Sequence, residues 1–93
     1  MIRSFADKKT ADFAQGRRVA AFHGIVRQAT KRLRILDNAD DLTTLRALPS
    51  NRLEALAGDR AGQYSIRINQ QWRICFRFQD GDAYDVEIVD YHR

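Results

Sequence analysis

The sequence predicts an α+β fold, because helix-type spacing of apolar residues fills its first half and strand-type alternation fills its second half. Residues 52–92 indicate a short strand, a glycine-containing loop and three further strands joined by tight turns. A chain of 93 residues is too short to bury two separate cores, so we expect one domain over residues 1–93. The expected architecture is a small, mostly antiparallel sheet with two N-terminal helices packed on one face.

The beginning of the chain indicates a short strand followed by a short helix. Residues 1–5 alternate apolar and polar side chains, as an edge or central strand does. Asp7 is a suitable N-cap for a helix that runs to about Gln15, and Gly16 ends it.

A longer amphipathic helix of about six turns is expected from Arg17 to about Asn38, because apolar residues recur there every three or four positions. They are Val19, Phe22, Ile25, Val26, Ala29, Leu33 and Leu36. The opposite side is basic, with Arg27, Lys31, Arg32 and Arg34. A solvated surface is the usual reason for such a face, and a nucleic-acid surface is the alternative. His23 lies beside the stripe and is expected to be packed or half-exposed rather than catalytic.

Three leucines at intervals of three, Leu42, Leu45 and Leu48, indicate a short helical or 3₁₀ turn that covers the core. Pro49 is expected to stop this turn and to favour an extended conformation at Leu48.

The strands are predicted from the parity of their side chains. One face is apolar: Tyr64, Ile66 and Ile68, then Trp72, Ile74, Phe76 and Phe78, and then Tyr84, Val86 and Ile88. The other face carries a band of arginine from Arg67, Arg73 and Arg77. Asp80-Gly81 predicts a two-residue hairpin turn, since both residues tolerate positive φ. Asp90 and His92 share parity with the apolar positions, so a bend or bulge must redirect them if they act with the arginines.

The composition favours a polyanionic partner without establishing one. Sixteen basic and twelve acidic residues give a formal charge of +4 and a pI near 9.7. Lysine occurs only at Lys8, Lys9 and Lys31, so most basic side chains are arginine, which suits bidentate phosphate recognition. Biased genomic base composition explains the same preference equally well.

Cysteine usage and hydropathy indicate a cytoplasmic protein without a disulfide. Cys75 is the single cysteine and is expected to fill the core or sheet. One Cys and two His, His23 and His92, cannot complete a structural zinc site, so we expect neither a metal nor a cofactor. No stretch has the pattern of a membrane span or signal peptide.

The second half offers one residue type for each role in metal-free RNA cleavage. A base must take the 2′-OH proton, a cation must stabilise charge on phosphorus, and an acid must protonate the leaving 5′-oxygen. Glu54 fits the base if burial perturbs it, Arg67 and Arg73 fit the cation, and His92 fits the acid. Arg60 could add a phosphate contact. Surface ion pairs, a solvated sheet face and a frayed C-terminus are the alternative explanations.

The chain resembles the HigB toxins of the RelE/ParE toxin superfamily, and more closely the plasmid-maintenance killer or GraT-like branch. The resemblance covers essentially the whole chain, and its motifs are MIRSF, LEALAGDRAGQYSIRINQQWRICFRF and DGDAYDVEIVDYH. It implies a RelE/ParE-like sheet with two helices on one face and an RNA-binding opposite face. It also implies ribosome-dependent endoribonuclease activity on mRNA in the A site, without a metal.

The resemblance also implies site residues. Asp90, Tyr91 and His92 match the C-terminal active-site run of HigB, and Arg73 matches the arginine of its WRI segment. Where HigB members carry the histidine and lysine of LHPLKGDR, this chain has Glu54 and Ala57. The related YoeB toxins carry a glutamate, taken as the general base, that aligns with Glu54. Asp90 and Tyr91 would then orient the acid His92 or stack on a base.

The family implies HigA, a helix-turn-helix antitoxin, as partner, so operator DNA would be contacted only through HigA. Two alternatives remain open. One is a ParE-like inhibitor of DNA gyrase, which similarity of fold does not exclude. The other is a weakened toxin that acts mainly by binding, because Ala57 stands where HigB members carry a lysine.

Overall fold

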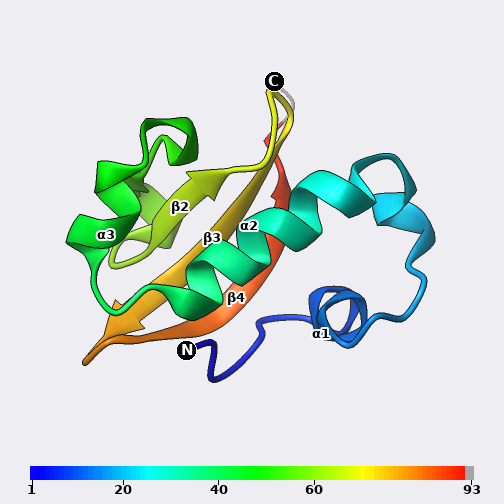
Figure 1. The fold of residues 1–93 in the computed structure, drawn as a ribbon, viewed down its shortest axis with the longest axis horizontal. Coiled ribbons are helices and arrows are strands. Elements are labelled where there is room, and N and C mark those ends of the chain that lie inside the picture. Colours follow the sequence, from blue (N-terminus) through cyan, green and yellow to red (C-terminus); the bar gives the residue numbers. More distant parts are fainter. Residues whose placement is uncertain (92–93) are drawn as a thin grey trace.

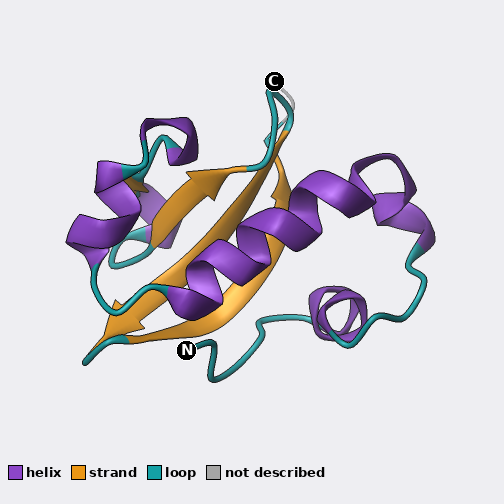
Figure 2. Cartoon of the chain, viewed as in Figure 1, coloured by secondary structure: helices purple, strands orange, loops and turns teal. Residues whose placement is uncertain are grey.

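The computed structural model describes residues 1–91, which form an α+β fold in which helices cover one face of a single sheet (Figures 1 and 2). The helical elements are α1 (Lys8–Ala14), the 3₁₀ segment η1 (Ala20–Ile25), α2 (Val26–Asn38), α3 (Leu42–Ala47) and the 3₁₀ segments η2 (Pro49–Asn51) and η3 (Gly58–Arg60). The strands are β1 (Glu54–Ala55), β2 (Tyr64–Arg67), β3 (Trp72–Gln79) and β4 (Asp82–Asp90). No helix within residues 1–91 has the length and apolar character needed to cross a membrane.

The four strands pair in the order β1-β2-β3-β4, and every pairing is antiparallel. The turn between β3 and β4 is Asp80-Gly81, with φ values of 52° and 84°. Positive φ at both central positions matches the right-handed twist of the strands, which is why Asp-Gly favours this hairpin. The expected antiparallel sheet and its hairpin are confirmed.

Helix α2 lies across the sheet and provides much of the core (Figure 1). The predicted apolar stripe is confirmed at Phe22 and Ile25 of η1 and at Ala29, Leu33 and Leu36 of α2, all of which are buried. They pack against the predicted apolar face of the sheet, whose fully buried members include Ile66, Ile74 and Phe76.

The α-helix predicted from Arg17 to Asn38 is wrong over residues 17–25. Residues 17–19 are not helical, residues 20–25 form the 3₁₀ segment η1, and the α-helix begins only at Val26, which is 50% exposed. Phe22 makes edge-to-face contacts with Phe13 and Trp72, each with ring centroids 5.6 Å apart. These ring contacts determine the path of residues 20–25. Gly24 has a low α-helix propensity, so it does little to favour an α-helix in this segment.

Residues 1–6 follow the free edge of β4 but do not form the predicted strand. Only two isolated parallel bridges occur, Ile2 with Ala83 and Phe5 with Val86. Between these two bridges, the N–H of Asp85 donates to the hydroxyl of Ser4 at 2.9 Å. This side-chain oxygen takes the place of the backbone carbonyl that a paired strand would present. The segment still satisfies backbone groups of an edge strand that would otherwise be open to pairing.

A bulge in β4 changes which of its residues face the core. Cys75 pairs with Glu87, but Arg77 pairs with Tyr84. Two residues of β4, Asp85 and Val86, therefore lie opposite one residue of β3, Phe76. Asp85 has a φ of 52°, the left-handed backbone that the G1 type of bulge has at its first residue.

The predicted common face of Tyr84, Val86 and Ile88 is therefore wrong at Tyr84. Ala83 is fully buried and pairs with Phe78, while Tyr84 pairs with Arg77 on the other side of the sheet. One extra residue inverts the alternation, because side chains alternate with a period of two.

The two ends of α1 agree with their predicted caps, whereas the prediction that three leucines cover the core is wrong at Leu48. The Asp7 carboxylate accepts the N–H of Thr10 at 2.9 Å, and Gly16 has a φ of 87° just after α1. In α3, Leu45 is fully buried, but Leu48 is 40% exposed and does not cover the core. Leu48 has the extended conformation expected before a proline, and this turns it away.

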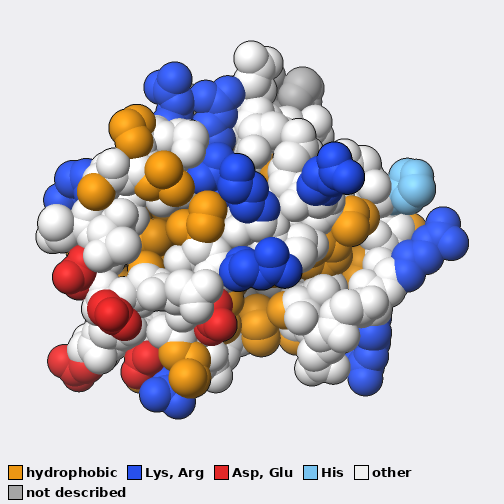
Figure 3. All heavy atoms as spheres, in the orientation of Figure 1, with side chains coloured by type: hydrophobic (Ala, Val, Ile, Leu, Met, Phe, Trp, Pro, Cys, Tyr) orange, Lys and Arg blue, Asp and Glu red, His pale blue; other side chains and the backbone are white. Residues whose placement is uncertain are grey.

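The outer face of α2 is basic, as predicted, except at one residue. Arg27, Lys31 and Arg34 are exposed, and Figure 3 shows basic side chains over this helix and acidic ones near the β3–β4 turn. Arg32 is instead half-buried and donates to the Asn51 side chain at 2.7 Å. His23 is exposed.

Asn51 connects three helical elements, so its replacement is expected to destabilise the fold. Its side chain is fully buried, donates to the Leu45 carbonyl at 2.9 Å and accepts from Arg32. Asn51→Ala should lower the free energy of unfolding by about 2 kcal/mol, because the Leu45 carbonyl loses a buried hydrogen bond and Arg32 loses a partly buried one. Urea denaturation measures this, with exposed Ser50→Ala as the control expected to change little. Equal effects of the two variants would contradict the prediction.

Candidate active site

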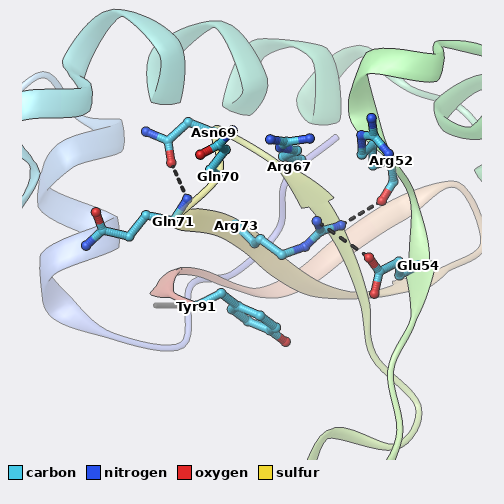
Figure 4. A pocket seen from close by; sticks show the side chains of 8 residues that line it. All are labelled: Arg52, Glu54, Arg67, Asn69, Gln70, Gln71, Arg73 and Tyr91. Atoms are coloured by element: carbon cyan, nitrogen blue, oxygen red, sulfur yellow. Dashed lines mark hydrogen bonds and ion pairs between the residues drawn. The ribbon is translucent and has the colours of Figure 1, made fainter. Parts of the chain in front are cut away.

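An open cavity of about 860 Å³ lies on the face of β2 and β3 that does not carry the core (Figure 4). It is lined by Arg52, Glu54, Arg67, Asn69, Gln70, Gln71, Arg73 and Tyr91. Three arginines and one glutamate make its lining positive, and the remaining side chains are neutral hydrogen-bonding groups. Such a lining suits a phosphate together with the polar groups around it.

Arg73 is the central cation of this cavity, and it is held in one orientation. Its Nε donates to the Ser65 hydroxyl at 2.7 Å, and one terminal nitrogen donates to the Arg52 carbonyl at 2.6 Å. The other terminal nitrogen lies 3.6 Å from a carboxylate oxygen of Glu54. Because only 11% of its side chain is exposed, the alternative explanation of a solvated arginine face does not hold at Arg73.

Glu54 lies at the cavity edge on the short strand β1. The register pairs it with Ser65, which places it beside the end of the Arg73 side chain. The expected partial burial of Glu54 is wrong, since 59% of its side chain is exposed. Within the described residues, the ion pair of Glu54 is with Arg73 and not with the more exposed Arg52 or Arg60. An exposed carboxylate beside a fixed cation is open to an incoming hydroxyl group.

Arg67 lies directly opposite Arg73 on neighbouring strands, as the parity of the strands predicts. Two like charges in this arrangement repel each other unless an anion lies between or above them. The half-buried Arg67 also lines the cavity, so both guanidinium groups contribute positive charge to its wall.

Tyr91 closes the cavity on the side of β4. Its backbone N–H donates to the Gln71 carbonyl, and its hydroxyl accepts from the Cys75 thiol at 3.8 Å. Burial raises the pKa of the Tyr91 hydroxyl above its ordinary value, and the contact with Cys75 acts in the same direction. Burial also raises the pKa of Cys75, which is fully buried as predicted. Tyr91 is therefore a neutral phenol near pH 7.

Arg60 and Asp90 lie next to the cavity, outside its lining. Arg60 donates to Glu87 through both terminal nitrogens at 3.2 Å and to Gln63 at 3.0 Å. Asp90 pairs with Trp72 in the sheet, which assigns it to the parity of the core side, and it accepts from the Gln71 amide at 3.1 Å. His92 lies outside the described residues.

Three features of the cavity were not predicted from the sequence. Arg52 has a left-handed backbone (φ 44°, ψ 55°), which directs its carbonyl to Arg73. Ser65 has the parity of the arginines, and that parity was the available signal for its role. Residues 69–71 form the turn between the two arginine-bearing strands, in which the Asn69 side chain accepts two backbone N–H groups at 2.8 Å. Amides in such a turn are usual for loops, so their composition carried no specific signal.

The fold and the basic cavity agree with the comparison to known proteins, which assigns the chain to the RelE-like toxins of type II toxin–antitoxin systems. Residues 3–92 match the family described as RelE-like toxin of type II toxin-antitoxin system HigB. The chain belongs to this HigB-like toxin family, and the resemblance found in the sequence is confirmed.

Two curated relatives support the assignment. The chain is 41% identical over 61 residues to Endoribonuclease HigB of Proteus vulgaris, a match covering 66% of this chain and 65% of that protein. It is 41% identical over 63 residues to Toxin HigB-1 of Vibrio cholerae, covering 68% of this chain and 65% of that protein. The matched segments therefore span just under two thirds of the length of these relatives.

Solved structures show the same fold at low sequence identity. A point mutant of YafQ from Escherichia coli aligns with a TM-score of 0.68 and 15% identity, covering 97% of this chain and 91% of that chain. The YoeB–YefM complex from Staphylococcus aureus aligns with a TM-score of 0.59 and 20% identity, covering 100% and 97%. The RelE/ParE-like architecture predicted for the chain is confirmed.

Proposed function

We propose that this toxin is an endoribonuclease that cuts translated mRNA in the ribosomal A site. The observation that carries the proposal is the geometry of Arg73, whose guanidinium is held between Ser65 and the Arg52 carbonyl with one nitrogen directed at Glu54. A fixed cation next to an exposed carboxylate supplies both charge stabilisation and a base at one place. The name of the Proteus vulgaris relative, Endoribonuclease HigB, agrees with this activity.

In the proposed reaction, Glu54 takes the proton of a ribose 2′-OH, and the 2′-oxygen attacks the adjacent phosphorus. Arg73 and Arg67 stabilise the additional negative charge on the phosphate oxygens. The bond from phosphorus to the 5′-oxygen breaks, and His92 gives its proton to that oxygen. The products are a 2′,3′-cyclic phosphate and a 5′-hydroxyl end, so protons and bonds balance without an added reactant.

The other candidate residues support the substrate in this proposal. Tyr91 presents an aromatic ring and a neutral hydroxyl to the cavity, which suits stacking on a base or orienting His92. Asp90 is assigned to orienting the proposed acid, His92. Arg60, whose side chain is 32% exposed, is assigned to a phosphate next to the scissile one.

We infer that the partner is an antitoxin of the HigA type, a helix-turn-helix protein, and that operator DNA is contacted only through it. The assignment to a type II toxin–antitoxin family supports a protein partner. The exposed basic residues of α2 and the formal charge of +4 favour acidic surface on that partner.

Mapping of RNA 5′ ends after induction of the chain tests the proposed function. We expect new ends inside translated codons that carry a 5′-hydroxyl, and we expect them on ribosome-bound mRNA but not on the same mRNA free in solution. If the proposed reaction produces 5′-hydroxyl ends, the new RNA ends are detected only after enzymatic 5′-phosphorylation. DNA-damage induction without new RNA ends would instead indicate inhibition of gyrase and would overturn the proposal.

A further inference from the structure

We propose that Ser65 is a positioning residue for the reaction: it acts through Arg73 and does not contact the RNA. The inference rests on the proposed function and concerns how its central cation is held. Ser65 is fully buried in β2, and its hydroxyl accepts the Nε–H of Arg73 at 2.7 Å. This hydrogen bond is the shortest contact between the Arg73 side chain and another side chain among those the structure gives.

The sheet register explains how this contact arises. The pairings place Glu54, Ser65 and Cys75 in one row across β1, β2 and β3. Arg73 starts from β3 two residues away from this row, and its Nε reaches the Ser65 hydroxyl. Its guanidinium ends beside Glu54 (Figure 4). A side chain larger than serine would occupy the space that the guanidinium crosses, and alanine would leave the Nε–H without its acceptor.

The remaining contacts leave one nitrogen of Arg73 for the substrate. The nitrogen that donates to the Arg52 carbonyl also lies 3.4 Å from the Ser65 carbonyl. Arg52 holds its left-handed backbone at the end of η2, where its N–H donates to the Pro49 carbonyl at 3.1 Å. Nε and one terminal nitrogen are thus bound to protein, and the second terminal nitrogen faces Glu54 and the cavity. A guanidinium held in this way loses little freedom when it meets the transition state.

The alternative is that Ser65 only satisfies buried polar groups and contributes to stability. The two roles differ in a double-mutant cycle. If Ser65 acts through Arg73, Ser65→Ala lowers the single-turnover cleavage rate by about tenfold in the wild-type background. It then has no further effect in the Arg73→Ala background, while KM changes less than about twofold.

The experiment compares cleavage of ribosome-bound mRNA by the folded chain, Ser65→Ala, Arg73→Ala and the double variant. Ser65→Cys replaces the hydroxyl with a larger thiol that is a weak acceptor, so this second variant should also lose rate, by a different structural change from that of Ser65→Ala. Thr10→Val is the matched control, since it removes another fully buried hydroxyl, the acceptor of the Ile88 N–H. It should lower Tm but leave the rate per folded molecule unchanged.

NMR of the Arg73 Nε–H separates a failure of this inference from a failure of the proposed function. We expect a signal protected from solvent exchange in the wild-type chain and loss of protection in Ser65→Ala, with or without RNA cleavage. An unprotected signal in the wild-type chain, or an equal rate loss in both cycle backgrounds, overturns the positioning role. A protected signal in a chain that does not cleave RNA overturns the proposed function and leaves the positioning of Arg73 intact.

Discussion

Arg73→Ala is expected to abolish growth arrest and to lower the mRNA cleavage rate by about 10²–10³-fold, the usual cost of losing one preorganised transition-state donor. The guanidinium is positioned before substrate binds, so its loss removes stabilisation that water cannot replace as well. Arg73→Lys should recover little of the rate, because an ammonium group cannot donate to Ser65 and the Arg52 carbonyl while also facing the cavity. Growth curves and single-turnover cleavage measure both variants.

Arg77→Ala is the matched control for this prediction. Arg77 lies on the same strand with the same parity, but it is exposed, pairs with Asp85 at 3.5 Å and does not line the cavity. Its replacement should leave cleavage nearly unchanged. Tm and binding to the antitoxin confirm that each variant is folded. Full toxicity of folded Arg73→Ala, or an equal loss in Arg77→Ala, would refute the role of Arg73.

Glu54→Gln is expected to lower the cleavage rate by about 10²–10⁴-fold, because an amide cannot take the proton of the ribose 2′-OH. His92→Ala should also lower the rate, because the leaving 5′-oxygen then lacks its proton donor. Single-turnover cleavage rates measure both variants.

Asp59→Asn is the control for charge alone, because Asp59 is an exposed carboxylate in the nearby segment η3 and does not line the cavity. It should leave the cleavage rate unchanged. An undiminished rate in folded Glu54→Gln would remove Glu54 from the role of base. Full toxicity of folded His92→Ala would remove His92 from the role of acid.

The elements whose signals are local could be predicted from the sequence. The cap at Asp7, the turn at Asp80-Gly81 and the buried stripe from Phe22 to Leu36 depend on neighbours within a few residues. The segment before Val26 could not be predicted, because its path depends on ring contacts of Phe22 with distant residues. The bulge at Asp85 was missed for a related reason: its N–H is satisfied by Ser4, which is 81 positions away in the sequence.

For the site, the sequence by itself determined the family, the residue types and the pairing of Arg67 with Arg73, since motif and parity are both present in the order of residues. Only the tertiary structure decided that Arg73 is buried, that Glu54 is its exposed partner, and that Ser65 and the Arg52 carbonyl hold it. These contacts join β1, β2 and β3 across the sheet. Their geometry depends on the register of the strands and on the left-handed backbone of Arg52. Neither can be predicted from the alternation of apolar and polar residues along a strand.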